Sequence, residues 1–187
     1  MTDRLPLPPD AQLTEDQRKA AARIAAGPRG AVFGPFVPLL RSPELMTRLQ
    51  LVGEFLRFES ALDDDLVELV ILYVSRAWDQ EFEFGHHRPL ALRAGLPEDV
   101  VDAVARGVRP PAGRPEVGYV YDLLDELHTT RQVSDATYAS AVEALGEVRV
   151  IEVVGTAGYY TTLAMTMNTA RTPPPDGAPR LPARERA

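Results

Sequence analysis

The chain has 187 residues, of which 45% are hydrophobic and 25% charged, as is typical of one soluble globular domain with a core of its own. It contains no cysteine, which excludes thiol nucleophiles, thiolate metal ligands and redox-active disulfides. Because the net charge is −7 and the apolar runs are short, we expect a cytoplasmic protein that binds neither nucleic acid nor membranes.

The N-terminal part of the sequence predicts an arm, a helix and an apolar loop. Residues 1–12 are rich in proline and show no helical periodicity, so they are interpreted as an arm. Thr14 and Gln17 have the spacing of a capping box, and a helix is expected to begin there and to end near Gly27. Residues 29–38 are apolar and punctuated by glycine and proline, and this loop is expected to pack against a groove or another subunit.

A second helix is expected to begin at Ser42, which stands as a cap ahead of Pro43, and to run to about residue 62. Its apolar residues recur every three or four positions, which predicts one buried face. The residues of this predicted face are Leu45, Leu49, Val52 and Leu56.

The central stretch predicts two successive helices. Residues 65–78 are apolar nearly all the way round, which indicates a buried helix, and the acidic run 63–65 is expected to cap it. Asp79 is expected to cap the next helix, which begins at Gln80, ends at Gly95 and is kinked by Pro89.

Four further helices are expected, at about 96–107, 115–130, 134–145 and 147–170. The proline-rich residues after them predict an extended tail. The chain is thus expected to comprise an arm (1–12), a helical domain (13–171) and a tail (172–187). The predicted fold class is all-α, a single-domain bundle of about eight helices around the buried helix at 65–78.

An acid–imidazole constellation lies in the central stretch. Gln80, Glu83 and His87 follow one another at spacings of three and four, which places them on one face of a helix. Glu68 is a lone acid in the most apolar helix, where a charge needs a partner. A histidine beside carboxylates exchanges protons near neutral pH, so this pattern indicates acid–base chemistry. The alternative is structural: Glu68 pairs with an arginine, and His87 is an imidazole of the core.

A second interpretation is a metal site, because carboxylate and imidazole ligands suit zinc or iron. Its candidate ligands are Glu81, Glu83, His86 and His87. Neighbouring histidines on a helix point about 100° apart and cannot both ligate one ion without distortion, so no metal is expected.

Aromatic residues surround the constellation. Trp78, Phe82 and Phe84 are candidates for the apolar walls of a small-ligand site, or for core residues. Four tyrosines are interpreted as packing or interface groups, because a phenol needs only one hydrogen bond to be buried. They are Tyr119, Tyr121, Tyr159 and Tyr160.

The motifs of the central stretch resemble those of the carboxymuconolactone decarboxylase family, which also includes alkylhydroperoxidase D. They read E-L-V-I-L-x-V-S-R-x-W at 68–78, F-E-F-x-x-H at 82–87 and A-L-R-A-G-L at 91–96. The segments at 29–36, 42–45 and 159–168 extend the resemblance. It implies an all-helical fold, alkylhydroperoxidase D-like, that assembles into homotrimers or hexamers.

The peroxidase branch of that family carries the motif E-x(11)-C-x-x-C-x-x-x-H, which runs a thiol relay. Glu68 and His87 stand in the places of its glutamate and histidine, but the two cysteine positions hold Gln80 and Glu83. Peroxide reduction by that route is therefore not expected. The chain instead resembles the decarboxylase-like branch, which implies a lyase that works by proton transfer without a cofactor.

The resemblance also implies roles. His87 is expected to donate or accept the proton, Glu83 to be its partner or a second acid–base group, and Glu68 to orient it or relay protons. The expected substrate is a small carboxylated or lactone-type molecule, whose loss of carbon dioxide leaves a carbanion or enolate to be protonated. Residues expected to bind it are Gln80, Trp78, Phe82, Phe84, Arg76 and His86. Arg76 or Arg29 is the candidate partner of the substrate carboxylate. The alternatives are a lactone hydrolase or isomerase, or a non-catalytic ligand-binding oligomeric module.

Overall fold

In the computed structural model, which describes residues 2–183, all of the regular secondary structure in that range is helical. A short 3-10 turn, η1 (Asp10–Gln12), precedes the first of nine α-helices formed by these residues. The helices are α1 (Glu15–Ala26), α2 (Phe36–Leu39), α3 (Pro43–Phe58), α4 (Asp64–Ala77), α5 (Glu81–Arg93), α6 (Glu98–Arg106), α7 (Pro115–Thr130), α8 (Asp135–Leu145) and α9 (Glu147–Ala170). The all-α class is confirmed, and each of the eight expected helices is found. The single turn α2 lies in the loop predicted at 29–38.

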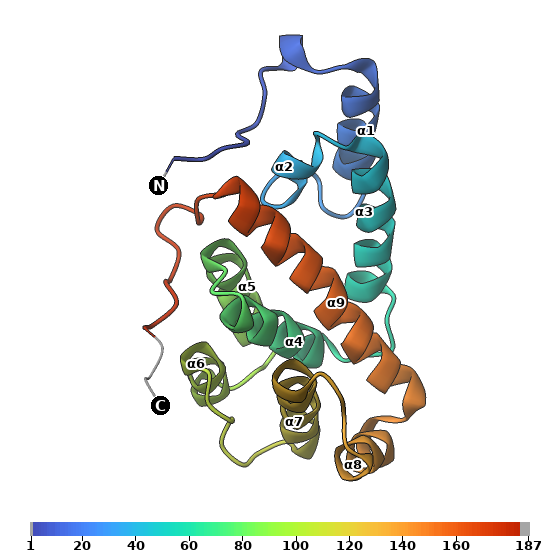
Figure 1. Cartoon of the computed structure of the whole chain (residues 1–187), viewed down its shortest axis with the longest axis vertical. Coiled ribbons are helices and arrows are strands. Elements are labelled where there is room, and N and C mark those ends of the chain that lie inside the picture. Colours follow the sequence, from blue (N-terminus) through green and yellow to red (C-terminus); the bar gives the residue numbers. More distant parts are fainter. Residues whose placement is uncertain (1, 184–187) are drawn as a thin grey trace.

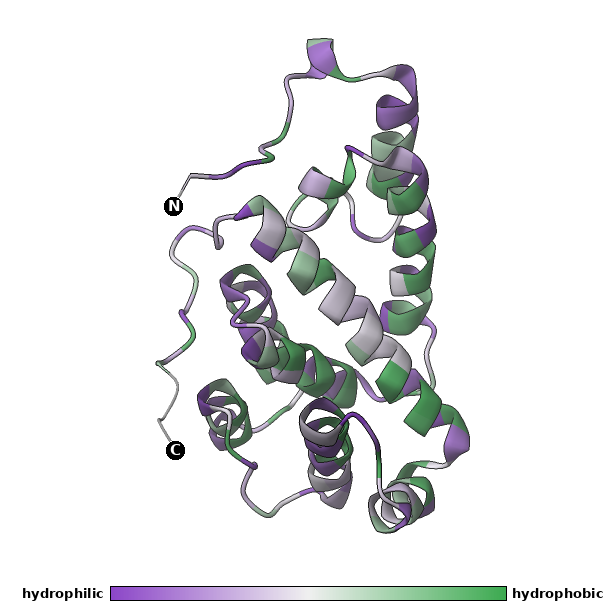
Figure 2. Ribbon diagram, viewed as in Figure 1, coloured by the Kyte–Doolittle hydropathy of each residue, from purple (hydrophilic) through white to green (hydrophobic). Residues whose placement is uncertain are grey.

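The centre of the fold is α4, as its apolar sequence predicts. Residues 66–76 are all buried, and Leu69 to Leu72 are completely inaccessible to solvent. Complete burial of one such aliphatic side chain stabilises the fold by about 1.5–3 kcal/mol. The long helix α9 crosses α4 and α5 and packs on its other side against α3, while α6, α7 and α8 lie below (Figure 1). Figure 2 shows the hydrophobic character of α4 at the centre of the molecule.

The buried face of α3 differs from the predicted one. Leu45 and Val52, expected to be buried, are 48% and 49% exposed. The buried residues of α3 are Met46, Gln50, Gly53 and Leu56. This helix carries apolar side chains all round, so hydrophobic spacing does not determine its orientation. The packing of α3 between α1 and α9 determines it instead.

Of the caps predicted for α1 and α3, the first is present and the second is not. The capping box of α1 is present, with the Gln17 amide donating to the Thr14 hydroxyl and the Gln17 side chain accepting from the Thr14 amide. At α3, Pro43 occupies the first turn as predicted, but the Ser42 side chain makes no capping hydrogen bond. That helix start therefore depends on proline and not on the serine hydroxyl.

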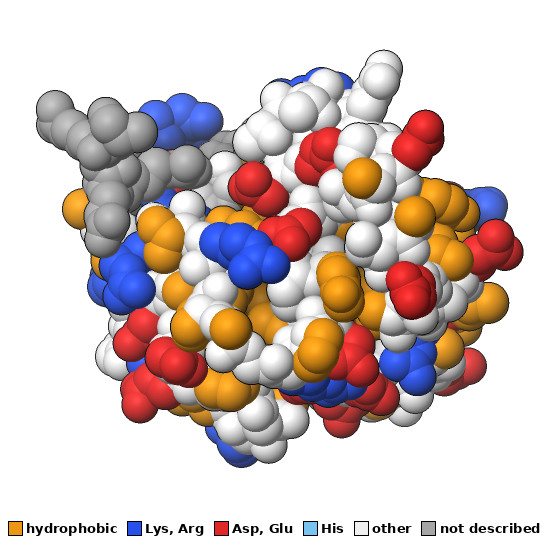
Figure 3. Space-filling view, turned by 90° about the horizontal axis from the view of Figure 1, so that it is seen from below, with side chains coloured by type: hydrophobic (Ala, Val, Ile, Leu, Met, Phe, Trp, Pro, Cys, Tyr) orange, Lys and Arg blue, Asp and Glu red, His pale blue; other side chains and the backbone are white. Residues whose placement is uncertain are grey.

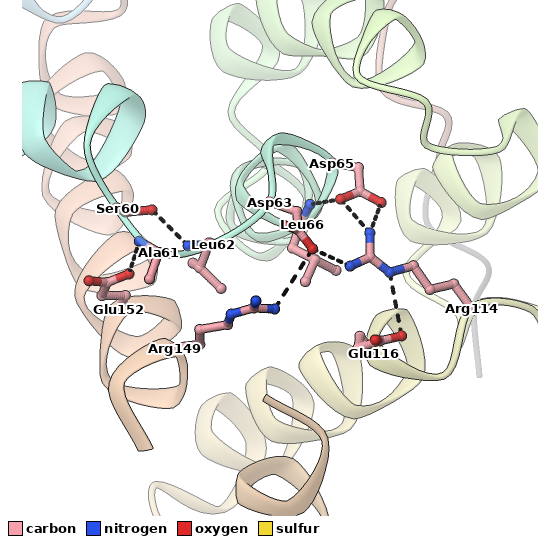
Figure 4. Close-up of polar contacts among 10 residues, drawn as sticks. All are labelled: Ser60, Ala61, Leu62, Asp63, Asp65, Leu66, Arg114, Glu116, Arg149 and Glu152. Carbon is pink, nitrogen blue, oxygen red and sulfur yellow. Dashed lines mark hydrogen bonds and ion pairs between the residues drawn. The ribbon is translucent and has the colours of Figure 1, made fainter. Parts of the chain in front are cut away.

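Asp63 occupies the N-cap position of α4 and two acids lie in its first turn, as predicted, but the Asp63 side chain makes no capping hydrogen bond. It pairs instead with Arg114 and Arg149, which reach it from the α7 and α9 ends of the fold (Figure 4). Arg114 also binds Asp65, at 2.6 Å between Nη1 and Oδ2. These guanidinium groups outcompete the helix amides for the Asp63 carboxylate.

The arm and the described part of the tail run on the same side of the molecule, and each donates a backbone hydrogen bond to the helical body (Figure 1). In the arm, the Arg4 amide donates to the Ala170 carbonyl at 2.8 Å, at the end of α9. In the tail, the Leu181 amide donates to Glu81 Oε2 at 3.2 Å, at the start of α5. Between residues 172 and 183 the tail has no helix or strand but makes a turn, in which the Ala178 amide donates to the Pro175 carbonyl. Residues 184–187 of the predicted tail lie outside the described residues.

The surface is mixed in character. On the face shown in Figure 3, acidic and basic side chains stand among small groups of hydrophobic ones. None of the helices in residues 2–183 is both long enough and apolar enough to cross a membrane.

Candidate active site

The packing of α5 on α4 brings Glu68 and His87 together. Glu68 Oε2 lies 2.8 Å from His87 Nδ1, although the residues are 19 positions apart. Both are almost completely buried, at 5% and 4% exposure. A hydrogen bond of this kind fixes the ring orientation and places the Nδ1 proton toward the carboxylate. Nε2 is then the ring nitrogen left for another partner.

The second oxygen of Glu68 pairs with Arg57 from α3. Arg57 Nη2 lies 3.2 Å from Glu68 Oε1. The carboxylate therefore has a guanidinium on one oxygen and an imidazole on the other, which is what a buried negative charge requires. The arginine partner and the acid–imidazole pair, two separate interpretations of the sequence, are both present in the structure.

Glu83 lies one turn before His87 on α5 and, unlike Glu68, is buried without a partner. It is only 2% exposed, and neither of its carboxyl oxygens has a hydrogen-bond partner. Burial raises the pKa of Glu83 well above its ordinary value, because a charged carboxylate without partners is disfavoured in an apolar environment. The surroundings of Glu83 thus favour the neutral carboxylic acid over the carboxylate.

The two histidines are held neutral. Burial lowers the pKa of His87, against the opposing influence of its hydrogen bond to Glu68, and the nearby Arg57 charge lowers it further. Burial, the neighbouring His87 and Arg57 lower the pKa of His86 to about 4. The two rings meet edge to face with centroids 5.0 Å apart. Both imidazoles are therefore proton acceptors at neutral pH.

Glu83 and His87 border a small cavity of about 40 Å³, which has room for only a few water molecules. Two arginines, Arg29 and Arg57, reach the same cavity. The remaining walls are mainly aromatic and include Phe33, Phe36, Phe82, His86, Tyr159 and Tyr160. An acid, a base and two cations thus border one small space with largely aromatic walls.

The apolar loop before α2 forms the outer wall of this cavity. Phe33 lies on the His86 ring, with centroids 5.3 Å apart. Gly34 has a φ of +55°, and a Cβ atom there would lie 2.5 Å from the Phe82 ring. Only glycine fits this backbone conformation so close to a ring. The groove against which the loop packs is therefore formed by α5 of the same chain.

Helix α9 supplies the inner wall. Tyr159 and Tyr160 are 5% and 3% exposed. Burial raises the pKa of Tyr159 to about 12 and that of Tyr160 further, so both are neutral phenols. The Tyr159 ring fits between α9 and α3 because Gly53 has no side chain, and a Cβ atom there would lie 2.1 Å from the hydroxyl oxygen. These tyrosines pack, as predicted, but they also face the candidate site.

Gln80 and Phe84 do not border the cavity. Gln80, and not Asp79, is the cap of α5: its side-chain oxygen accepts from the Phe82 amide at 2.7 Å, and its side-chain nitrogen donates to Asn168 at 2.9 Å. Asp79 has a φ of +49° and cannot serve as that cap. Phe84 is 2% exposed and belongs to the hydrophobic core.

Trp78 and Arg76 lie at a different cavity, of about 410 Å³, between α4, α6 and α7. Arg76 pairs with Asp79 and donates to the carbonyls of Ala105 and Pro182. Of the two arginines named as candidates for the substrate carboxylate, the structure thus places Arg29, and not Arg76, beside Glu83 and His87.

Arg57 and Phe33 are missed by the sequence analysis. The signal for Arg57 is a stripe on α3, Gln50–Gly53–Arg57, with spacings of three and four and with polar or small residues on a helix otherwise rich in apolar ones. The proposed metal ligands do not converge: among residues 2–183, no group of three or more acidic and histidine side chains is arranged to hold an ion.

The sequence pattern of the carboxymuconolactone decarboxylase family matches residues 43–126. No curated protein is significantly similar to the chain. Two crystal structures share its fold. One is a peroxidase-related protein with an alkylhydroperoxidase AhpD core from Ralstonia eutropha, with a TM-score of 0.76, 17% identity and 93% of each chain covered. The other is a peroxidase-related protein from a Silicibacter species, with a TM-score of 0.73, 10% identity, and 93% of this chain and 92% of that chain covered.

At these identities the two structures establish the fold, and the family match covers α3 to most of α7, including Glu68, Glu83 and His87. The resemblance seen in the motifs is confirmed. Residues 43–126 of this protein thus match the pattern of the carboxymuconolactone decarboxylase family, and the chain has an alkylhydroperoxidase D-like fold without a single cysteine.

Proposed function

We propose that the protein is a cofactor-independent acid–base enzyme, similar to carboxymuconolactone decarboxylase, that acts on a small carboxylated or lactone-type molecule. The observation that carries the proposal is the Glu83 carboxyl group, which is buried, lacks a hydrogen-bond partner and borders a cavity together with His87. An unsatisfied buried polar group costs about 1–3 kcal/mol. Such a cost is expected where the group has a chemical task.

The neutral Glu83 carboxyl suits the proton-donating step. Decarboxylation breaks the bond between carbon and the leaving carboxylate, carbon dioxide departs, and the electron pair stays on the substrate carbon. Glu83 gives its proton to that carbon and becomes a carboxylate. In an apolar environment this charge is unfavourable, so Glu83 regains a proton readily.

His87 suits the return of that proton. Its Nδ1 is engaged with Glu68, and Nε2 is available to take a proton from solvent and pass it to Glu83. The imidazolium that forms in between is stabilised by the Glu68 carboxylate, which Arg57 holds in place. Thiol-based peroxide reduction is not proposed, because the chain has no cysteine.

The test is turnover of a panel of carboxylated lactones and small unsaturated acids, followed by carbon dioxide release and by NMR of the products. We expect one group of compounds to lose carbon dioxide, and both Glu83→Gln and His87→Ala to lower kcat by about 10²–10⁴-fold. His128→Ala is the matched control, because His128 lies on α7 with its Nδ1 on the Leu124 carbonyl and should leave turnover unchanged. A panel that gives only lactone opening or isomerisation, or a Glu83→Gln variant with the wild-type rate, would overturn the decarboxylase proposal.

A further inference from the structure

The candidate site contains more positive than negative charge. Arg29 and Arg57 both border the cavity, and within residues 2–183 Glu68 is the one acid paired with either of them. Glu83 and the two histidines are neutral in this environment. The site therefore has an excess of about one positive charge in a small space with largely aromatic walls. Uncompensated charge of this kind favours an anionic ligand.

The two arginines differ in how far their donors are occupied. Arg29 Nη1 donates to the Gln50 side-chain oxygen at 3.2 Å, and its guanidinium lies 5.1 Å from the centroid of the Phe36 ring. Arg57 has one Nη on Glu68, but its Nε is buried and has no hydrogen-bond partner. A buried guanidinium donor that is left unsatisfied is rare, because Arg groups are strongly solvated or paired.

We propose that Arg57 anchors a carboxylate of the substrate in this cavity, with Arg29 as the second cation. That the bound carboxylate belongs to the substrate rests on the proposed function. Binding of a carboxylate at Arg57 does not depend on it. The anchored carboxylate is one that the reaction retains, since a guanidinium on the leaving carboxylate would stabilise the substrate more than the transition state. The body of the ligand displaces the outer wall, where the Phe33 side chain is already 36% exposed.

The test measures binding of simple anions and needs no turnover. Acetate and benzoate are titrated at pH 7 into the full-length protein, with benzamide as the neutral counterpart of benzoate, and the ring signals of His86 and His87 are followed by NMR. Saturable shifts are expected for the carboxylates, with benzamide at least about tenfold weaker. Arg57→Lys, which keeps a cation beside Glu68 but loses the planar set of donors, should weaken carboxylate binding by about tenfold or more.

Arg48→Gln is the matched control, because Arg48 lies on the same helix with its side chain 75% exposed and should bind as the wild type does. Arg57→Gln is measured in parallel, and if it does not fold, Arg57→Lys decides. The proposal is overturned if neither carboxylate binds the wild type, if benzamide binds as tightly as benzoate, or if Arg57→Lys binds like the wild type. Carboxylate binding that depends on Arg57 in a protein without turnover would refute the proposed function and leave this inference standing.

Discussion

Two groups of charges on α4 follow different rules. At the N-terminal end, Asp63 and Asp65 are held by Arg114 in a cluster near the surface (Figure 4), in which the side chains of Asp63 and Arg114 are 49% and 36% exposed. About one turn further along, Glu68 is buried between Arg57 and His87, and Glu83 on α5 is buried without a hydrogen-bond partner for its carboxyl oxygens. In the first group the carboxylates are paired near the surface, whereas in the second Glu68 is paired within the core and Glu83 is left without a partner.

The difference shows which charges are costly to the fold. Water screens the cluster at Asp63 and Asp65, so each pair there contributes little and its loss is tolerated. In the core, each missing partner leaves an uncompensated charge or an unsatisfied group. A core acid that has no partner is therefore more informative about function than a surface acid that has several.

The largest expected loss of stability comes from removing Glu68, the acid that pairs with both Arg57 and His87 in the core. Glu68→Ala leaves the Arg57 charge and the His87 Nδ1 proton without their partner, and it should lower the free energy of unfolding by about 3–5 kcal/mol. Urea unfolding at pH 7 measures this change. A loss below about 1 kcal/mol would mean that water reaches Arg57 and His87, and the distinction between the two groups would fail.

The next effect is a dependence of stability on pH. The pKa of Glu83 is raised in the folded protein, so the folded state holds a proton that the unfolded state releases above about pH 4.5. The stability contributed by this proton is complete below that pH and is lost as the pH rises toward the folded-state pKa, by up to about 1.4 kcal/mol per pH unit.

Glu83→Gln cannot titrate, so its stability relative to the wild type should rise as the pH increases above about 4.5. Urea unfolding of both proteins between pH 4 and 8 measures this difference. Glu143→Gln, which changes an exposed acid on α8, should run parallel to the wild type. If the curve of Glu83→Gln also runs parallel to that of the wild type, then Glu83 is ionised in the folded protein and is not the proton donor.

The sequence predicts those parts of the fold that depend on local chemistry. Caps and hydrophobic periodicity define the helices, because they act within a few residues, and α4 is buried because no face of it is polar. The Glu68–His87 contact follows from the spacing of the motif. The short turn between α4 and α5 leaves these two helices few ways to pack on each other.

The remainder of the site depends on helix orientation, which local pattern does not determine. Arg57 reaches Glu68 only because α3 is rotated away from its predicted buried face. Arg76 is on α4 like Glu68, but it points to the other side of that helix, toward α6. The Phe33 loop and the α9 tyrosines come together through long-range packing, which one sequence by itself does not reveal.

The smallest expected effect is at the exposed end of α4. Asp63→Asn removes one carboxylate from Arg114 and Arg149, but the Asp63 side chain is 49% exposed and Arg114 keeps Asp65. We expect a loss of about 0–1 kcal/mol, smaller still in high salt, and unchanged turnover. Urea unfolding at low and high salt measures it. A loss as large as that of Glu68→Ala would show that this cluster is as tightly coupled to the fold as the buried one. The exposure of a charged group would then not predict how much it contributes to stability. The absence of a partner at the buried Glu83 would be weaker evidence for catalysis.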